Sequence, residues 1–435
     1  PGLRHDHPHA GVAAEAYRPV WEGTVSRRQI LWLIGLATGV LLLVLPVIVS
    51  TLPNREYLMH LAITAYFYAI LASSWSLLAG YAGQFSFGHM AFMAIGGYTT
   101  GLIGKFVRFV SAPTEVCREM PIGGGWHMVF LNPREVGTIN EVCLDVARQQ
   151  TLPRGTLIVF PPIWASILMG LVMGAVFGLL IGWLVLRLRS TYLALFTIGF
   201  SEILRAAISA EIPITEGQSG LELVPLFPNG VNLFGFAFSD TSKVPPYYVM
   251  LFLLLIALGV MAWLAASRFG LFVRAIREDE EAAAALGVDI VRYKVLVFVV
   301  TSMLAAAAGA VQAHYIGIIT PNILIILQMS LVISMAVIGG LENIFTAAIG
   351  AIIIQVALEL LRTSFDIGPI TVDMSVWRLV FFGLVLMVTL RFQRNGLIAP
   401  LIDRFLRAGV AEETVSIRQV DTEQTAAASE TAKGK

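Results

Sequence analysis

The stretch RFGLFVRAIREDEEAAAALGVDIVRYK, residues 268–294, is the only strongly charged segment inside an otherwise apolar body. It carries ten charged residues and has long hydrophobic segments on both sides. A connection between two membrane spans needs only about five polar residues to turn. The extra length and the Ala-rich centre, Glu278 to Leu286 with Gly287 after it, therefore predict a short helix built to be held by another protein.

Composition assigns the class of protein. Of the 435 residues, 57% are hydrophobic and 13% are charged, and the mean hydropathy is +0.78. A soluble core cannot hide this much apolar surface, whereas a bilayer accepts it directly. The formal net charge is zero, so no electrostatic attraction to nucleic acid is expected. The sequence predicts a polytopic membrane protein with no nucleic-acid partner.

The hydrophobic runs predict an all-α fold. A hydrocarbon core about 30 Å thick needs roughly 20 apolar helical residues per crossing, and backbone groups in lipid must bond internally. The runs are too long and too unalternating for barrel strands. We expect about ten transmembrane helices, some of them broken, at residues 30–51, 57–80, 87–109, 161–186, 191–210, 247–266, 295–314, 324–339, 344–361 and 376–391.

Basic residues near the span ends predict the orientation, because they concentrate on the cytoplasmic side. If the chain has ten spans, all four groups of basic residues lie on the same side of the membrane. These groups are Arg27 and Arg28 before the first span, Arg187 and Arg189 after the fourth, the charged loop at residues 267–294, and Arg391, Arg394, Arg404 and Arg407 after the tenth. Both termini are then cytoplasmic. The transmembrane domain covers residues 23–408, and its two long outward loops cover about 110–160 and 211–246.

The tails and the first outward loop carry weaker signals. Residues 1–22 and 409–435 are polar and aperiodic, so both are predicted to be disordered. Three alternating histidines, His5, His7 and His9, lie in the first tail, and we predict no metal site. The only two cysteines, Cys117 and Cys143, fall in the first outward loop, where a disulfide and two unrelated thiols both remain open.

Glycines punctuate the predicted spans. In the fourth span, glycine recurs every four residues and lines one helix face, which allows another helix backbone to approach closely. We predict a helix-packing seam made of Gly170, Gly174, Gly178 and Gly182, and Gly97 and Gly101 repeat the spacing once in the third span.

Two glycine-rich breaks interrupt the spans and hold polar residues. Such a break at membrane depth is tolerated only where it packs inside protein or lines a water-filled path, although the first one also fits an ordinary cytoplasmic turn. We predict a translocation path at Gly83, Gln84, Ser86, Gly88 and His89, with Gly339, Gly340, Glu342 and Asn343 on the other half. Glu342 is costly in lipid, so we expect it at the interface or facing a cavity.

The remaining ionisable residues in or near the spans form two pairs spaced three apart, Glu202 with Arg205 and Glu359 with Arg362. Each pair lies on one helical face and can neutralise itself. No phosphate-binding GxxxxGK[ST], HExxH or GxSxG pattern occurs in the sequence. We therefore expect no enzymatic activity from this chain. A secondary transporter that uses Glu202, Glu342 or Glu359 as proton relays, or a passive channel, remains an alternative from a different class.

Several segments resemble one family. GYAGQFSFGHMAFMAIGGYTTGL (residues 80–102) is similar to GYxGQxSxGHxAFxxIGAYTxAL, and RSTYLALFTIGFSEILR (residues 189–205) to RGxYFAxxTLAFxEIxR. Residues 270–311 resemble GRAxxAIRExExAAxxxGxxxxxxKxxAFxxSAxxAGxAGAL. Looser matches are TEGQSGL for TGGxxGL and RFQRNGL for FRPxGL. These patterns are those of LivM-like permease subunits of the branched-chain amino-acid ABC importer family, and the resemblance covers about residues 55–400.

The resemblance implies an integral permease of the bacterial inner membrane. Its partners would be a homologous second permease, two ATP-binding subunits and an external solute-binding protein, within the lipid bilayer. It would import branched-chain or other hydrophobic amino acids, bind no cofactor itself, and leave ATP and Mg to the partner ATPases. The residues implied in the ATPase-coupling loop are Arg277, Glu280, Glu281, Ala282, Ala283 and Gly287.

Two departures from the family pattern concern the solute. The usual GGxGxxxGPxxGA appears as GGLENIFTAAIGA, and the first outward loop is long. The Leu-Pro that normally follows EAAxxxG is also absent. A urea or short-chain amide importer of the same architecture therefore remains an alternative substrate class.

Overall fold

A computed structural model describes residues 39–49, 51–110, 118–123, 126–130, 158–159, 163–185, 190–227, 231–233, 236–238, 242–362, 365–367, 370–372, 374–393 and 396–400. Both tails, His5, His7, His9, Cys117 and Cys143 lie outside these residues. The chain divides into two compact units, one made of Pro1–Leu45 with Leu401–Lys435 and the other of Pro46–Pro400. Of the first unit only residues 39–45 are described, and they belong to an apolar helix at Gly39–Val49.

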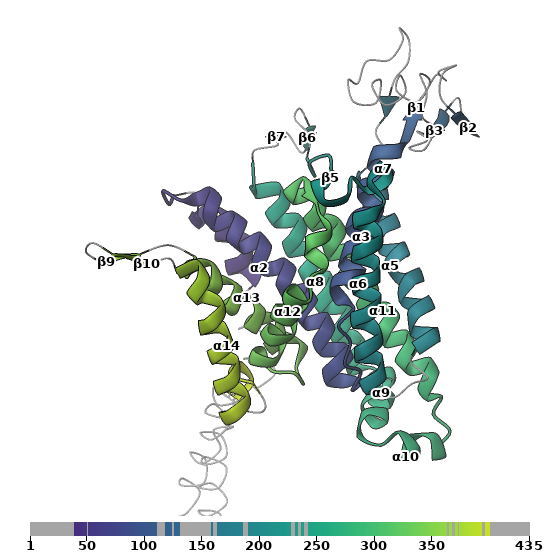
Figure 1. Cartoon of the computed structure of the whole chain (residues 1–435), viewed down its shortest axis with the longest axis vertical. Coiled ribbons are helices and arrows are strands. Elements are labelled where there is room, and N and C mark those ends of the chain that lie inside the picture. Colours follow the sequence, from purple (N-terminus) through teal and green to yellow (C-terminus); the bar gives the residue numbers. More distant parts are fainter. Residues whose placement is uncertain are drawn as a thin grey trace, which may run out of the picture. The chain divides into compact units, whose positions relative to one another are not determined.

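The second unit is a helical bundle (Figure 1). Each of the ten predicted span ranges contains a helix, because a long apolar run can bury its backbone polar groups only by bonding them within the helix. Besides Gly39–Val49, these helices are α2 (Arg55–Ser76), α3 (His89–Phe106), α5 (Ile163–Val185), α6 (Ser190–Ala210), α8 (Val244–Ala266), α11 (Ile290–Ile316), α12 (Ile326–Gly339), α13 (Ile344–Leu360) and α14 (Met374–Phe392).

Five helices among the described residues are long and apolar enough to cross a membrane, or six spans if one bent pair is included. The five are Arg55–Tyr81, Ile163–Val185, Tyr192–Ala210, Val244–Ala266 and Ile290–Ile316. The protein is thus a polytopic helical membrane protein. The described residues therefore contain fewer than ten helices that meet both criteria of length and hydropathy. The remaining helices are either shorter or, like α3, carry glycine, threonine and lysine that lower the hydropathy.

The bent pair α12 and α13 occupies the ranges of the predicted eighth and ninth spans. With 14 and 17 residues, these helices are about 21 and 26 Å long, less than the roughly 30 Å of a bilayer core. The chain bends by 119° between them. Along α13, Ser76 donates to the Leu341 carbonyl at 2.7 Å near one end, and Tyr57 donates to the Glu359 carbonyl at 3.3 Å near the other. α13 therefore runs antiparallel beside α2.

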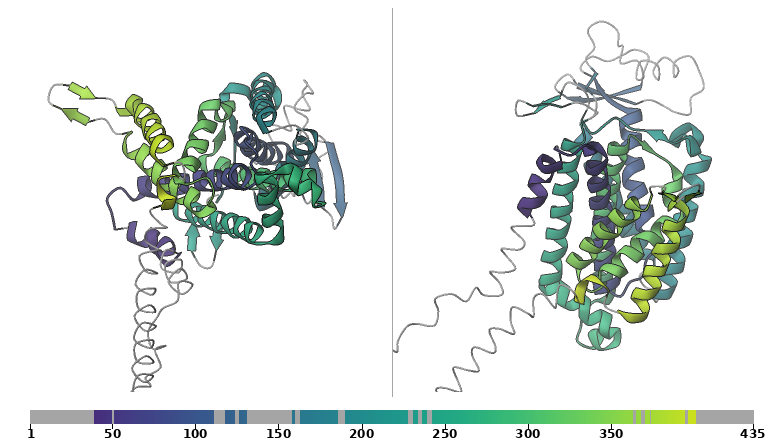
Figure 2. Two further views of the ribbon diagram at one scale, coloured as in Figure 1. Left: turned by 90° about the horizontal axis from the view of Figure 1, so that it is seen from below. Right: turned by 90° about the vertical axis from the view of Figure 1, so that its left-hand side faces the viewer.

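The bundle has two ends, the Arg55 end, where α2 begins, and the Gly80 end, where the helix that continues α2 stops. The Gly80 end also holds α9 (Arg268–Glu278) and α10 (Glu280–Ala285), and the Arg55 end holds the strands that follow α3. Figure 1 shows both ends, and Figure 2 shows the helices side by side from two further directions.

Helices α2 and α11 form the centre. In their most apolar windows 83% and 78% of residues are buried, against 28%, 22% and 33% for Ile163–Val185, Tyr192–Ala210 and Val244–Ala266. The exposed faces of α5, α6 and α8 carry large apolar side chains such as Leu195 and Phe252. This is the pattern of helices that face lipid or another membrane subunit, with the core between α2 and α11.

Short strands make the predicted all-α class incomplete. An antiparallel sheet of order β2-β3-β1-β4 follows α3, with β1 Val107–Val110, β2 Arg118–Gly123, β3 Trp126–Phe130 and β4 Ile158–Val159. Three two-stranded pairs join β5 (Leu221–Glu222) to β8 (Ile318–Ile319), β6 (Val231–Leu233) to β7 (Phe236–Phe238), and β9 (Phe365–Ile367) to β10 (Ile370–Val372). Except for β1, which overlaps the end of the predicted third span, these strands lie outside the predicted span ranges. There water can satisfy edge groups, and β-branched and aromatic residues favour extended backbone.

The glycine seam of α5 packs against α3 and α11. A Cβ at Gly170 would lie 2.8 Å from the Gly96 carbonyl oxygen, and one at Gly178 would lie 2.8 Å from the Ser302 Cβ. A Cβ at Gly174 would overlap the Ala306 Cβ. Gly182 is also buried. The seam replaces side-chain volume with close backbone contact.

We expect Gly174→Ala to destabilise the protein by about 1 to 3 kcal/mol, because the added methyl overpacks the α5 contact with α11. Thermal unfolding of the purified protein in detergent measures this effect. The matched control is Gly259→Ala in α8, where a Cβ meets nothing within 4 Å. That change should be neutral or stabilising by up to about 1 kcal/mol through helix propensity. Equal melting temperatures for both variants would contradict the seam.

Candidate functional site

The charged loop folds as two helices. α9 ends at Glu278, Asp279 is extended with φ −154° and ψ 108°, and α10 begins at Glu280. The predicted single helix from Glu278 to Leu286 is therefore two residues too long at its start. Asp279 causes the break, because its Oδ1 accepts the Glu281 and Ala282 backbone N–H groups at 2.9 and 3.0 Å and so caps α10.

Gly287 ends α10 in a Schellman motif. The N–H of Val288 donates to Ala283 O at 3.1 Å, and the N–H of Gly287 donates to Ala284 O at 2.9 Å. This geometry needs a left-handed residue, and Gly287 has φ +81°. Nothing lies within 4 Å of a Cβ built there, so the backbone angle alone requires glycine.

Lys294 holds α10 against the bundle. Its side chain is only 4% exposed, and its Nζ lies 2.5 Å from Glu280 Oε1, whose side chain is 54% exposed. Ala283 is buried, whereas the neighbouring Glu281 and Ala282 are exposed. α10 thus presents a small, acidic outer face while one buried ammonium fixes its first turn.

Arg277 joins the charged loop to both glycine-rich breaks. Its Nη2 lies 2.6 Å from Glu342 Oε1, and its Nη1 donates to the Gly80 carbonyl. Its Cγ lies 3.3 Å from a Cβ built on Gly83. The two breaks also touch directly, because a Cβ on Gly80 would overlap the Leu341 carbonyl oxygen. The Arg277 guanidinium therefore bonds both breaks and joins them to the charged loop, although the three segments are far apart in the sequence.

The first break lies inside protein. After α2 the chain makes a π-helical turn, η1 (Leu77–Tyr81), and runs without regular structure to His89, the first residue of α3. Trp75 Nε1 donates to Ser86 O at 2.8 Å, and the Phe87 N–H donates to Thr197 Oγ1 at 2.9 Å. These contacts from α2 and α6 hold the segment in place. It is a packed break, because Gln84, Ser86 and His89 are at most 1% exposed.

Several buried polar atoms of this break lack partners. Gln84 Oε1 and both ring nitrogens of His89 have no hydrogen bond. Desolvated polar groups without partners cost free energy and are retained in few places. Their concentration at a packed break makes this segment a candidate functional site.

The second break is also tightly packed. Gly340 has φ +124°, and a Cβ on Gly396 would lie 2.6 Å from the Gly340 Cα. Asn343 caps α13 by accepting the Phe345 N–H at 3.0 Å. Glu342 is 67% exposed and pairs with Arg277. Its carboxylate therefore lies at the Gly80 end and not in the apolar interior.

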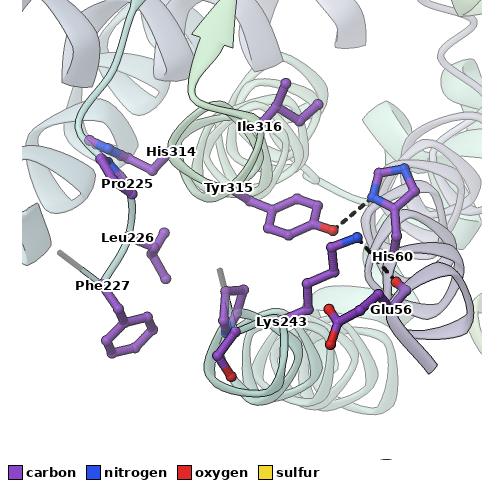
Figure 3. Close-up of a pocket in the computed structure, with 11 residues that line it drawn as sticks. Glu56, His60, Pro225, Leu226, Phe227, Lys243, His314, Tyr315 and Ile316 are labelled. Carbon is purple, nitrogen blue, oxygen red and sulfur yellow. Dashed lines mark hydrogen bonds between the residues drawn. The ribbon is translucent and has the colours of Figure 1, made fainter. Parts of the chain in front are cut away.

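Two cavities lie toward the Arg55 end. The outer cavity has a volume of about 670 Å³ and is lined by Glu56, His60, Pro225, Leu226, Phe227, Ser242, Lys243, Pro246, His314, Tyr315 and Ile316 (Figure 3). The inner cavity has a volume of about 200 Å³ and is lined by His60, Thr64, Phe67, Tyr68, Met90, Met93, Gly309, Gln312, Ala313, Ile316, Ile318, Ile319, Ile323 and Gln328. Helices α2 and α11 contribute to both.

The sequence-predicted residues thus gather at the Gly80 end, whereas the cavities lie elsewhere. Neither cavity is lined by Gln84, Ser86, His89 or Glu342. Sequence reasoning missed the cavity residues, because an apolar helix face that lines a cavity reads like one that packs in a core. It also missed Lys294 as a residue that holds α10. The feature that could have indicated this role is its position as a single lysine at the start of a long apolar run.

The structure confirms both predicted ion pairs. Arg205 Nε lies 3.0 Å from Glu202 Oε1, and Arg362 Nη1 lies 3.2 Å from Glu359 Oε1. Glu202 is 57% exposed on α6. Among the described residues there is no group of three or more His, Cys, Asp or Glu side chains that could hold a metal ion.

Comparison with known proteins identifies relatives over most of the chain. LivM of Escherichia coli K12, a high-affinity branched-chain amino acid transport system permease protein, is 27% identical over 337 residues, 72% of this chain. LivM of Salmonella typhimurium LT2 is 26% identical over the same share. The chain spans 66% of the length of both. LivH of Escherichia coli K12 is 26% identical over 294 residues, 67% of this chain and 80% of that protein.

No solved structure matches the chain. The family model described as "Branched-chain amino acid transport system / permease component" matches residues 57–390. This range contains α10, both breaks and, apart from Glu56, the lining residues of both cavities. Since it covers more than half of the chain, the protein belongs to the family of branched-chain amino acid transport permease components.

Proposed function

We propose that the chain is the membrane-spanning permease of an ABC importer that carries branched-chain or other hydrophobic amino acids across the bacterial inner membrane. ATP hydrolysis takes place in two partner ATP-binding subunits. A homologous second permease completes the path, and an external binding protein delivers the solute. Similarity to both LivM and LivH supports the pairing with a second permease.

One observation carries the coupling mechanism: Arg277 of the charged loop bonds both breaks at the Gly80 end. A force applied to α10 passes through α9 to Gly80 and Glu342. These are the points where α2 and the α12–α13 pair are interrupted, and interrupted helices yield more readily than continuous ones. Closure of the ATPases can in this way rock the helices around a fixed path.

The surface of α10 supports an ATPase contact. Leu286, next to Gly287, is 85% exposed although it lies in a charged loop outside the spans. A large apolar side chain at such a position is a typical anchor for a partner protein. Glu281, Ala282 and Ala285 are exposed beside it, and the alanines let a partner surface come close.

The proposed topology keeps ten crossings with both termini in the cytoplasm. α12 begins next to η3 (Pro321–Leu324), whose Leu324 packs with Leu221 and Ile319 toward the Arg55 end. It ends at Gly339, toward the Gly80 end, and α13 returns. The pair thus changes side twice, as two predicted spans would, and the basic groups remain on one side.

The cavity linings disfavour a proton-coupled secondary transporter. Glu202, Glu342 and Glu359, its candidate relays, line neither cavity, and each pairs with an arginine. A relay needs an ionisable group that faces the path.

Uptake by the reconstituted complex tests this function. We expect leucine to accumulate in proteoliposomes that contain both permeases, both ATPases, the external binding protein and ATP, and an inactivated ATPase should stop uptake. Leucine stimulation of ATP hydrolysis, compared with urea and short amides, identifies the solute class. Uptake by the chain alone under a proton gradient would contradict an ABC permease.

A further inference from the structure

The inner cavity between α2 and α11 has the lining of a solute site. Most of its lining side chains are apolar, and its polar groups are Thr64, Tyr68, His60 and the carboxamides of Gln312 and Gln328. No carboxylate or ammonium group occurs among these lining residues. Such a lining suits a small apolar solute with a few polar groups. It does not suit a divalent cation, which requires several oxygen ligands.

Its volume matches a small amino acid. An apolar cavity of roughly 150 Å³ can hold benzene, so the 200 Å³ of the inner cavity can take a branched aliphatic side chain together with its amino-acid head group. Phe67, Met90 and Met93 are each at most 5% exposed and form its apolar wall. Methionine side chains adapt to irregular apolar shapes.

Gln312 supplies the polar observation. It lies near the C-terminal end of α11, four residues before Ile316. Its side chain is 8% exposed, and its Oε1 has no hydrogen-bond partner. A buried amide oxygen without a partner costs free energy unless something donates to it. The α-ammonium group of an amino acid is such a donor. Gln328 differs, because Tyr68 already donates to it at 3.4 Å.

The outer cavity leads to this site. The two cavities share His60 and Ile316. At this shared wall His60 Nδ1 and Tyr315 Oη lie 2.7 Å apart and their rings stack with centroids 5.7 Å apart. Lys243 and Glu56 also line the outer cavity, with Lys243 Nζ donating to the Glu56 backbone carbonyl at 3.1 Å (Figure 3). One ammonium and one carboxylate at the mouth complement a zwitterion.

The first break follows the inner cavity along α2 and α3, although no residue of the break lines the cavity. Met90 lines the cavity and directly follows His89, whose ring nitrogens are both unpartnered. Outer cavity, inner cavity and break therefore follow one another along the central helices, from the Arg55 end toward Arg277.

We propose that the inner cavity binds the apolar amino acid during transport, with Gln312 contacting its head group and Phe67, Met90, Met93 and Ile323 enclosing its side chain. The outer cavity is its entrance, and the His60–Tyr315 pair must separate for it to pass. This inference rests on the proposed function and names the solute site within it.

Thiol protection tests the site directly. In the full complex with Cys117→Ser and Cys143→Ser, the Ile323→Cys variant is treated with benzyl methanethiosulfonate, which adds a benzyl group to the thiol. We expect leucine to slow the labelling, and labelling to reduce uptake by about tenfold or more. The control is Ile203→Cys on α6, where Ile203 is 71% exposed; its labelling should be insensitive to leucine and harmless. Equal labelling of Ile323→Cys with and without leucine would overturn the proposal.

A glutamine pair provides the second measurement. Gln312→Leu should lower leucine uptake about tenfold or more, the loss expected for one buried hydrogen bond to a charged group, while binding-protein-stimulated ATP hydrolysis persists. Gln355→Leu makes the same change at a residue that is 9% exposed and lines neither cavity, and it should retain uptake. Wild-type uptake by Gln312→Leu would count against the site.

The two proposals can fail separately. If the wild-type complex shows no ATP-driven leucine uptake, the proposed function fails. Leucine protection of Ile323→Cys is a binding measurement, so it still decides whether the cavity is a leucine site. If uptake works and both cavity variants behave like their controls, only the site proposal fails.

Discussion

Replacing Arg277 with methionine uncouples the importer. Leucine uptake per ATP hydrolysed should fall by roughly tenfold to a hundredfold, since a hydrogen bond to a charged group contributes about 1.5 to 3 kcal/mol and 1.4 kcal/mol is tenfold. The Gly80 carbonyl bond should account for most of the loss. The pair with Glu342, 67% exposed, is screened by solvent and contributes less. Uptake and ATP hydrolysis measured in the same proteoliposomes give the ratio.

Two carboxylates near Arg277 provide the controls. Glu342→Gln keeps a hydrogen-bond acceptor at the second break and should cause only a small loss. Glu278→Gln changes a carboxylate that lies 3.7 Å from Arg277 Nε and is 76% exposed, but that joins no break, so it should behave like wild type. A normal uptake ratio for Arg277→Met would refute the role of this residue as the link between α10 and the breaks.

Replacing Gly287 with valine disconnects α10 from the ATPase. A β-branched residue is strongly disfavoured at φ +81°, so the Schellman motif should open and the exposed Leu286 should move. We expect ATPase binding to the permeases to weaken by about tenfold or more, because a left-handed conformation costs roughly 1 to 2 kcal/mol for a residue with a Cβ. Binding of the isolated ATPase to permease complexes in nanodiscs measures this.

Gly287→Asn is the matched control, because asparagine tolerates the left-handed conformation and nothing lies within 4 Å of the new Cβ. It should retain most of the affinity. If valine and asparagine weaken binding equally, side-chain bulk at the surface is responsible and not the backbone angle. Unchanged binding in both would exclude the end of α10 as part of the contact.

The charged loop shows how far sequence reasoning reached. The Ala-rich run and Gly287 predicted a helix and its end, because capping and left-handed glycine are local properties of a few consecutive residues. The start was misplaced, since Asp279 can either continue a helix or cap one. In this chain its side chain bonds the Glu281 and Ala282 N–H groups, and the helix divides there.

The glycine-rich breaks show the opposite limit. Their composition predicted interrupted helices, but nothing in the local pattern predicts that Gly80 packs on Leu341 and that Arg277 bonds both segments. Arg277 is 197 positions from Gly80 and 65 positions from Glu342 in the sequence. Contacts between residues so far apart in the sequence depend on how the helices pack. In a membrane, small residues and the fit of helix surfaces decide this packing, and a hydrophobic pattern does not.

The sequence by itself determined that the chain crosses a membrane as helices, where most of those helices lie, and which family it belongs to. These properties follow from composition, run length and local motifs, because lipid allows a backbone few other solutions. Only the tertiary structure decided that α12 and α13 form a bent pair and that the cavities lie between α2 and α11. It also decided that Gln312 is a buried polar group in an apolar wall. A cavity is the space that packed helices leave between them, so no single helix carries its signature.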